Sequence, residues 1–332
     1  MLTNNIYSFY LTSLHHALLI LGREGIGKGE YAEALAARLL CEKPSAQQAC
    51  GTCEACRWLS AGNHPDYRQI TLTTEEETEE PVSSGTKKAS PTQIRVEQIR
   101  DLRDFVFVGS HRQGRRVILI NPADAMNPAA SNSLLKILEE PPPSVYFLLI
   151  SSKVRQLLPT LRSRCRQIVL SVPKATDSIG WLIEQGVEDP ENLLSFCGGA
   201  PLKAKGLFSN GGWEGITQII SSLKAEDRNP LALAGIWETT IKGDDSLGMD
   251  RFIETLQKWL NDLIRTSRNL SPRYLPSLAA ELRKISSRCS PKRLLRFHQD
   301  LLKIRAVAKH PLNSQLFLED VAARYLQAIT PY

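Results

Sequence analysis

Five short apolar runs in the first half of the chain alternate with longer stretches of mixed polarity. The first, Ala17–Leu21, is followed by a glycine-rich turn and by a helical pattern that continues to Leu40. Strand, loop and helix in this order are typical of the opening unit of a nucleotide-binding α/β domain. Further strands are predicted at 67–72, 117–121, 145–150 and 167–170. Runs as apolar as VILI and YFLLI favour a parallel sheet that is buried on both faces.

The pattern changes after residue 172, where strand-like runs stop and apolar residues recur at helical spacing. Residues 175–208 are expected to form two or three short helices, because the turn sequences GVEDP and CGGAP interrupt them. Beyond them two longer helices each carry an apolar face: Phe252, Leu256, Trp259, Leu260 and Leu263 on one, and Leu318, Val321, Ala322, Tyr325 and Leu326 on the other. We interpret both faces as core packing.

These patterns predict an α/β domain at 1–172 and an all-α remainder, since 332 residues exceed what one ordinary core organises. The remainder divides into a short helical segment at 173–208 and a helical domain at 209–332. Residues 73–93 are rich in Glu, Thr, Ser, Pro and Gly. Such a composition buries too little apolar surface to offset the entropy of ordering, so a mobile loop is expected there.

The charge and the hydropathy restrict the class of protein only moderately. The formal net charge is +6, and the acidic segment between residues 71 and 93 contributes −3, so the rest of the chain carries +9. This excess favours contact with a polyanion, but the basic residues look too dispersed to indicate DNA by themselves. Neither a secretory leader pattern nor an apolar run long enough to cross a bilayer is present, so a soluble cytoplasmic protein without membrane contact is predicted.

The glycine-rich turn has the spacing of a phosphate-binding loop, with four residues between Gly22 and Gly27 and with Lys28 next. In such loops backbone N–H groups and the lysine hold the phosphates, while a following Ser or Thr ligates magnesium. Here Gly29 takes that position. The apolar strand at 117–121 ends in Asn121 where a metal-binding carboxylate is needed, and Asp124 lies beyond the strand. We therefore predict a phosphate loop that does not hydrolyse nucleotide, and binding without turnover stays open.

Four of the seven cysteines crowd into sixteen residues, at Cys41, Cys50, Cys53 and Cys56. Two overlapping C-x-x-C pairs aim thiolates at one ion, and a fourth thiolate completes a tetrahedral shell. The spacing predicts a structural zinc site with no open position for catalysis, in which His64 finds no vacancy. The alternative is a set of unligated or redox-active cysteines.

One predicted helix carries an unusual charge at its end. Asn127 caps it, Pro128 takes its first position, and the run PPP stops it. Glu139 and Glu140 lie at the carboxyl end, where the helix dipole disfavours anions. Solvation of exposed carboxylates explains them, and a role outside the helix is the alternative.

Several motifs together resemble the bacterial clamp-loader ATPases of the AAA+ class. They are NSLLKILEEPP and LLPTLRSRC, accompanied by HHALLILG, AGNHPDY, the cysteine cluster and HPLNSQLFLED. The resemblance covers most of residues 15–172 and thins out in the helical remainder. It implies a RecA-like AAA+ domain with a zinc module at 41–56, a helical lid at 173–208, and a helical collar at 209–332 that mediates oligomerisation.

The resemblance also assigns roles to particular residues. Arg164 matches the arginine finger that such a subunit projects into the ATP site of its neighbour, whereas Arg162 and Arg166 look like ordinary surface charges. In motor relatives an arginine of the lid senses nucleotide, and here Leu202 takes that position with Lys203 adjacent. The motor subunits of that family keep a Ser or Thr after the loop lysine and acidic residues after the strand, where this chain has Gly29, Asn121 and Pro122.

The function implied by the resemblance is that of a non-hydrolysing clamp-loader subunit in a DNA polymerase holoenzyme. Its partners would be the delta and the tau or gamma subunits, the β sliding clamp, and primed DNA reached through the complex. Zinc would be its own cofactor, and ATP would bind only on neighbouring subunits. One alternative is an active motor subunit that uses Lys28. Another is a zinc-dependent nucleic-acid binder unrelated to clamp loading.

Overall fold

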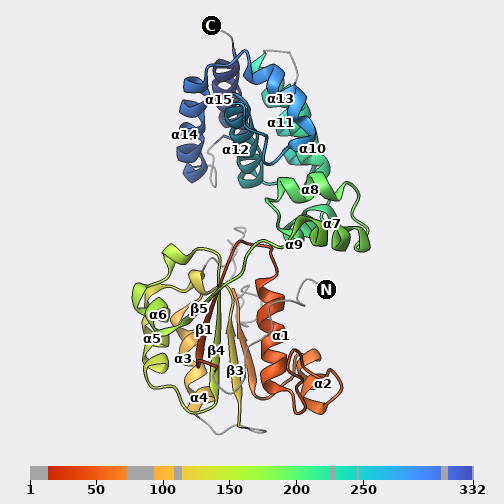
Figure 1. Cartoon of the computed structure of the whole chain (residues 1–332). Coiled ribbons are helices and arrows are strands. Elements are labelled where there is room, and N and C mark those ends of the chain that lie inside the picture. Colours follow the sequence, from red (N-terminus) through yellow and green to blue (C-terminus); the bar gives the residue numbers. More distant parts are fainter. Residues whose placement is uncertain are drawn as a thin grey trace. The chain divides into compact units, whose positions relative to one another are not determined.

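The structure is a computed structural model that describes residues 14–72, 93–107, 114–224, 229–244, 247–307 and 313–330. The chain divides into two compact units, Met1–Val172 and Pro173–Tyr332, shown in Figure 1. The loop expected at 73–93 lies outside the described residues, apart from Gln93. The finer division of the second unit into a lid at 173–208 and a collar at 209–332 stays a prediction.

The first unit is built on a parallel five-stranded sheet with the strand order β2-β3-β4-β1-β5. The strands are β1 (Ala17–Leu21), β2 (Tyr67–Ile70), β3 (Arg116–Ile120), β4 (Val145–Ser151) and β5 (Arg166–Val169). Every residue of β1 and β3 is buried, as the apolar runs predicted. The expected strand at 67–72 is shorter because β2 is an edge strand that pairs only with β3, and Ile70 is already opposite the last residue of β3.

Helices cover both faces of this sheet (Figure 1). On one side α1 (Lys28–Leu40) packs against β1, β3 and β4, and α2 (Glu54–Ser60) lies against α1. On the other side lie α3 (Val96–Arg100), α4 (Leu102–Phe107), α5 (Pro128–Glu139) and α6 (Pro159–Arg164), with the short 3₁₀ turns η3 (Ala123–Ala125) and η4 (Val154–Gln156). The core of the second side takes alternate strand residues such as Leu19 and Phe147, as the two-residue period of a strand requires. The predicted RecA-like α/β arrangement is confirmed.

The second unit is entirely helical over its described residues. Its elements are α7 (Ala175–Glu184), α8 (Pro190–Phe196), α9 (Pro201–Ser209), α10 (Gly212–Lys224), α11 (Pro230–Gly243), α12 (Met249–Thr266), η5 (Pro276–Leu278), α13 (Ala279–Ser286), α14 (Pro291–Val307) and α15 (Ser314–Ile329). None of the described helices is long and apolar enough to span a bilayer. One core runs from α7 to α15 and contains both predicted apolar faces.

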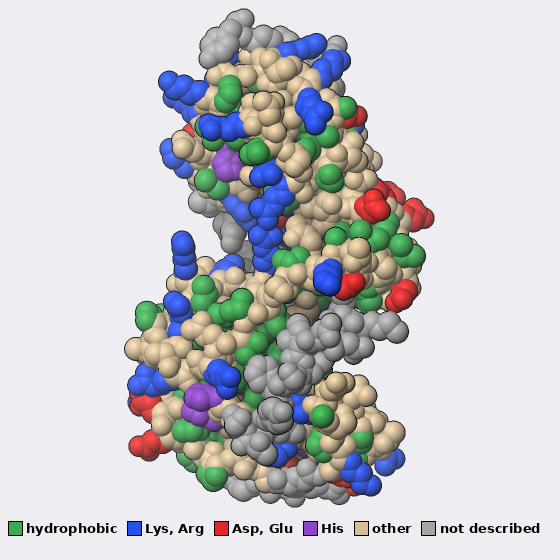
Figure 2. Space-filling view, viewed as in Figure 1, with side chains coloured by type: hydrophobic (Ala, Val, Ile, Leu, Met, Phe, Trp, Pro, Cys, Tyr) green, Lys and Arg blue, Asp and Glu red, His purple; other side chains and the backbone are tan. Residues whose placement is uncertain are grey.

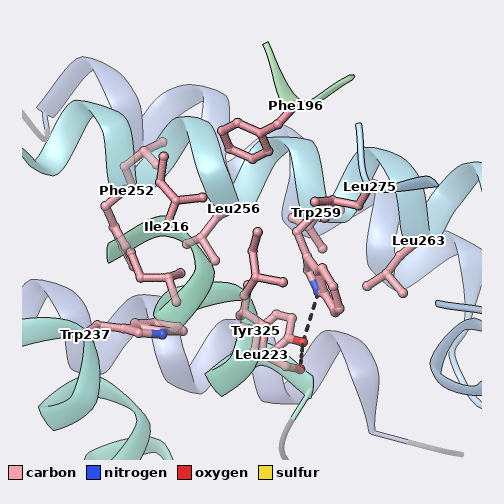
Figure 3. Close-up of a cluster of buried hydrophobic side chains, with 14 of the residues drawn as sticks. Phe196, Ile216, Leu223, Trp237, Phe252, Leu256, Trp259, Leu263, Leu275 and Tyr325 are labelled. Atoms are coloured by element: carbon pink, nitrogen blue, oxygen red, sulfur yellow. Dashed lines mark hydrogen bonds between the residues drawn. The ribbon is translucent and has the colours of Figure 1, made fainter. Parts of the chain in front are cut away.

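A hydrogen-bonded chain crosses the middle of this core (Figure 3). The indole N–H of Trp259 on α12 donates to the hydroxyl of Tyr325 on α15, at 3.1 Å. The same hydroxyl donates to the carbonyl oxygen of Leu223 at the end of α10, at 2.7 Å. Trp259 and Tyr325 are 0% and 1% exposed, so water cannot replace either partner. The chain therefore ties three helices together through one oxygen atom.

Removing that oxygen tests the contribution of this chain. In Tyr325→Phe the Trp259 N–H and the Leu223 carbonyl lose their partner inside a dry core, so we expect the free energy of unfolding to fall by about 1–3 kcal/mol. Urea unfolding followed by tryptophan fluorescence measures the change. The matched control is Tyr274→Phe, which removes a hydroxyl from a half-buried ring at the edge of the same core and should cost less than about 0.5 kcal/mol. Equal stability of the wild type and Tyr325→Phe would contradict the expectation.

Candidate functional site

The glycine loop between β1 and α1 owes its shape to close backbone approaches. A Cβ atom on Gly22 would lie 2.7 Å from Ile26 Cδ1 and 2.9 Å from the carbonyl oxygen of Leu170, so no larger residue fits there. Gly27, immediately before α1, has a φ of +101°, which L-residues with side chains rarely adopt. The two glycines thus permit the tight path that leads from the strand into the helix.

Lys28 begins α1 and is held inside the loop, with 6% of its surface exposed. Its ammonium group donates to the carbonyl oxygen of Arg23 at 2.6 Å and to the Ser152 hydroxyl at 2.8 Å. Burial lowers the pKa of Lys28, and the nearby carboxylates of Glu24, Asp124 and Glu30 oppose that shift. The lysine is therefore fixed at the carboxyl end of the sheet, where phosphate loops hold their ligand.

Sequence reasoning missed Ser152. It follows β4, and β4 pairs in parallel with β1, so the parallel register brings its hydroxyl to the loop that follows β1. Asp124 joins the same cluster, because its carboxylate accepts the backbone N–H of Ser152 at 3.0 Å. Asp124 lies in η3, beyond the end of β3, as the sequence predicted. The positions of these strand ends were a usable signal, because parallel strands end at one edge of a sheet.

The two positions that matter most for hydrolysis carry no suitable side chain. Gly29 lies in the first turn of α1, and a Cβ placed on it would meet nothing within 4 Å. A threonine would therefore fit, and crowding does not explain the missing hydroxyl. Asn121 follows β3, and its backbone N–H bonds to the carbonyl of Ile70 on the neighbouring strand. Its side chain offers an amide where enzymes that hydrolyse nucleotides at a phosphate loop carry a metal-binding carboxylate.

Arg164 lies at the end of α6, at the surface of the first unit. One of its Nη atoms donates to Glu139 Oε1 at 2.6 Å, and the other donates to the carbonyl oxygen of Thr160 at 3.2 Å. The side chains of Arg164 and Glu139 are 36% and 50% exposed. Glu139 is the residue whose place at the end of α5 looked unfavourable. It is both half exposed to solvent and ion-paired with a residue of another helix. The guanidinium is thus held in one direction while remaining accessible.

The position predicted for a lid sensor has no cation on it. Leu202 lies in α9, and Lys203 next to it forms an ion pair with Glu254 on α12, at 2.9 Å. Lys258 pairs with the same carboxylate at 2.8 Å. Although burial alone would raise it, these two ammonium groups lower the pKa of Glu254 to about 2. Lys203 is therefore engaged within the second unit.

The four predicted cysteines come together in space. Cys41 follows α1, Cys50 lies in the connecting loop, Cys53 caps α2, and Cys56 lies within α2. All four sulfur atoms lie within 4.8 Å of one another, and two of the separations are 3.9 Å (Cys41 to Cys53) and 4.0 Å (Cys50 to Cys56). Thiolates at zinc are separated by about 3.8 Å when each Zn–S bond is near 2.3 Å. The cluster is therefore the right size to hold one metal ion.

The surroundings of the cluster also suit thiolates. Backbone N–H groups of Cys50, Cys53 and Cys56 donate to the sulfurs of Cys41, Cys50 and Cys53, at 3.2, 3.3 and 3.4 Å. The backbone N–H of Thr52 lowers the pKa of Cys50 to about 6, whereas burial raises that of Cys56 to about 12. A metal ion bound among the four sulfurs would favour the thiolate form of each cysteine. His64 is not part of the cluster: its Nδ1 accepts the backbone N–H of Asp66 at 3.1 Å.

A parallel sheet with a glycine loop and a buried lysine between its first strand and first helix defines a protein of the phosphate-loop nucleotide-binding class. Within that class the match is specific. Residues 7–174 match the family described as "DNA polymerase III, delta subunit", and the chain belongs to that family.

Individual relatives agree with the family. The chain is 41% identical over 228 residues to the DNA polymerase III subunit delta' of Pseudomonas aeruginosa, a match that covers 68% of this chain but less than two thirds, 65%, of the relative. With the subunit delta' of Escherichia coli the identity is 28% over 324 residues, covering 94% of this chain and 90% of the relative. The DNA polymerase III subunit tau of Salmonella typhimurium is 35% identical over 185 residues, covering 56% of this chain and 25% of that protein.

Among solved structures, a gamma subunit-related protein from Thermotoga maritima aligns over 95% of each chain, with 18% identity and a TM-score of 0.42. A similarity of this size carries no information about function.

Proposed function

We propose that this chain acts as the delta prime subunit of a bacterial clamp loader, which opens the ring-shaped β sliding clamp and places it on primed DNA. The observation that carries the proposal is a fully formed phosphate loop without hydrolytic partners, in a chain of this family: Gly29 offers no hydroxyl although one would fit. The chain would be a stator, a rigid subunit that positions its neighbours and hydrolyses no ATP.

Arg164 would supply chemistry to a neighbouring subunit. A guanidinium directed at transferring phosphoryl oxygens stabilises the charge that develops on them. Two features of this chain support the role. Arg164 is partly exposed at the end of a helix. Glu139 and the Thr160 carbonyl each accept one N–H from a different Nη atom, which orients the guanidinium and leaves a further N–H on each Nη for a phosphate.

The remaining partners follow from the same proposal. The delta subunit and the tau or gamma motors would complete the ring of subunits, with ATP bound on the motors. Residues 173–208 would form the lid, and residues 209–332 the collar through which subunits oligomerise. Clamp loading takes place in the cytoplasm, where the chain would act.

Zinc is the metal that we propose for the four-cysteine cluster. Four sulfur ligands within 4.8 Å of one another favour zinc over hard cations, which prefer oxygen. Cys41, Cys50, Cys53 and Cys56 would fill its four positions, so the ion would hold the carboxyl end of α1 to α2. Because no position stays open for water or substrate, it would contribute no chemistry to the reaction.

Reconstitution tests the proposed function. A complex of delta, tau or gamma and this chain should load β clamp onto primed DNA, and omission of the chain should reduce loading to background. The isolated chain and its Lys28→Ala variant should both release phosphate at the level of a buffer control. Lysine-dependent hydrolysis by the isolated chain would favour the motor alternative, and undiminished loading without the chain would contradict the stator role.

A further inference from the structure

The positive charge of this protein is concentrated in one short part of the second unit. Residues 265–305 contain eight arginines, three lysines and two carboxylates, a net charge of +9. The whole chain carries +6, so the remaining residues together carry −3. This segment runs from the end of α12 through α13 and most of α14. The excess is therefore concentrated in one segment of the sequence and is not spread over the chain.

A shallow groove in this segment gathers cations, and its described lining residues include no carboxylate. It has a volume of about 690 Å³. Its lining includes the polar or cationic Arg268, Ser290, Lys292, Arg296 and Gln299, together with Leu295. Arg268, Lys292 and Arg296 are all exposed, and no carboxylate is found among the described residues that line the groove. Figure 2 shows Lys and Arg side chains gathered over the part of the molecule where Figure 1 has α12 to α15.

A neighbouring groove differs from this one because carboxylates line it together with cations. It is also rich in arginine, but Asp300 and Asp320 line it as well. Arg324 there bonds to both carboxylate oxygens of Asp320, at 3.0 and 2.9 Å. In that groove Asp320 neutralises Arg324, and Arg296 lines both grooves. Among the described residues no carboxylate lines the first groove, and Arg268 and Lys292 line that groove alone, so these two cations can attract an external anion.

We propose that the groove lined by Arg268, Lys292 and Arg296 binds the phosphate backbone of DNA. Arginine forks and lysine ammonium groups contact phosphate oxygens without reading the bases, and the exposed Gln299 side chain adds a neutral hydrogen-bond donor. A net charge of +9 spread over 41 residues matches an extended polyanion of repeating phosphates better than the few carboxylates of one acidic peptide. All the residues of this proposed site come from this chain, and the proposal does not rest on the proposed function in clamp loading.

Binding of labelled DNA to the full chain tests this site. The probes are a fluorescein-labelled 30-nucleotide single strand and the corresponding duplex, titrated at several salt concentrations. Each cation that contacts a phosphate steepens the salt dependence of the logarithm of the affinity by about 1. The triple variant Arg268→Ala, Lys292→Ala, Arg296→Ala should therefore flatten that slope by about 3 and weaken binding more than about tenfold near 0.1 M salt.

The matched control removes three cations from the same unit but away from the groove: Lys174→Ala, Lys205→Ala, Lys242→Ala. It should change the affinity less than about threefold. Melting curves verify that both variants stay folded. Equal losses in the two triple variants would overturn the proposal, as would a wild-type chain that does not bind DNA at low salt. If the groove variant bound DNA as well as the wild type but no longer bound another clamp-loader subunit, the groove would be a protein-binding surface. That result would also overturn the proposal.

Discussion

Replacing Arg164 with alanine should lower ATP hydrolysis at the adjoining motor site by about 10³-fold or more, the range found when arginine fingers are removed. The reason is electrostatic: the charge that builds on the phosphoryl oxygens would lose a fixed cation inside a site that excludes water. The effect should appear at one site of the complex only. Rapid-quench measurement of the first turnover, with clamp and primed DNA present, should show a smaller burst of phosphate release. The decrease should equal the amount of ATP that this one site hydrolyses in the wild-type complex.

Two further variants separate this role from a loss of charge or of fold. Arg166→Ala removes an exposed cation two residues away and should leave the burst unchanged. Glu139→Ala keeps Arg164 but releases its Nη contact, so we expect a smaller loss, of several-fold, with little change in stability, since exposed ion pairs contribute about 0–1 kcal/mol. A burst of wild-type size in Arg164→Ala would show that Arg164 is not an arginine finger. The stator role is tested separately, by measuring clamp loading in a complex that lacks this chain.

Loss of zinc should be the second large effect. Structural zinc sites bind their ion with apparent free energies of about 10–16 kcal/mol at neutral pH, and most of that supports the local fold. We expect the freshly purified chain to contain about one zinc, and Cys53→Ser to contain almost none. The N–H of Cys56, which now donates to the Cys53 sulfur at 3.4 Å, should then exchange with solvent much faster, together with the rest of α2.

The control for this prediction is Cys289→Ser, outside the cluster. Cys289 is 9% exposed, and its thiol donates to the carbonyl oxygen of Ile285 at 3.1 Å, a bond that a serine hydroxyl can keep. Elemental analysis should find zinc unchanged in that variant. A wild-type chain prepared without chelators and found free of zinc would leave the four cysteines unligated, as the alternative interpretation holds.

Much of the architecture was predictable from local patterns. Every expected strand lies within two residues of an observed one at each end, and α1 ends at Leu40 as predicted. Apolar periodicity identified the faces of α12 and α15 that form the core of the second unit. These features are set by backbone preferences and by burial, which act over a few residues and are therefore visible in the sequence.

The sequence by itself determined which side chains the phosphate loop lacks and which metal ligands are available. Gly29 and Asn121 are deficits at particular positions, and four thiols within sixteen residues can meet at one ion with little help from the rest of the fold. Only the tertiary structure decided which distant groups meet. Lys28 bonds to Ser152 because β1 and β4 run in parallel register, and Arg164 pairs with Glu139 because α5 packs against α6. Likewise Arg268 and Arg296, which looked dispersed along the chain, line one groove. Such contacts depend on how whole elements pack, and no local pattern encodes that.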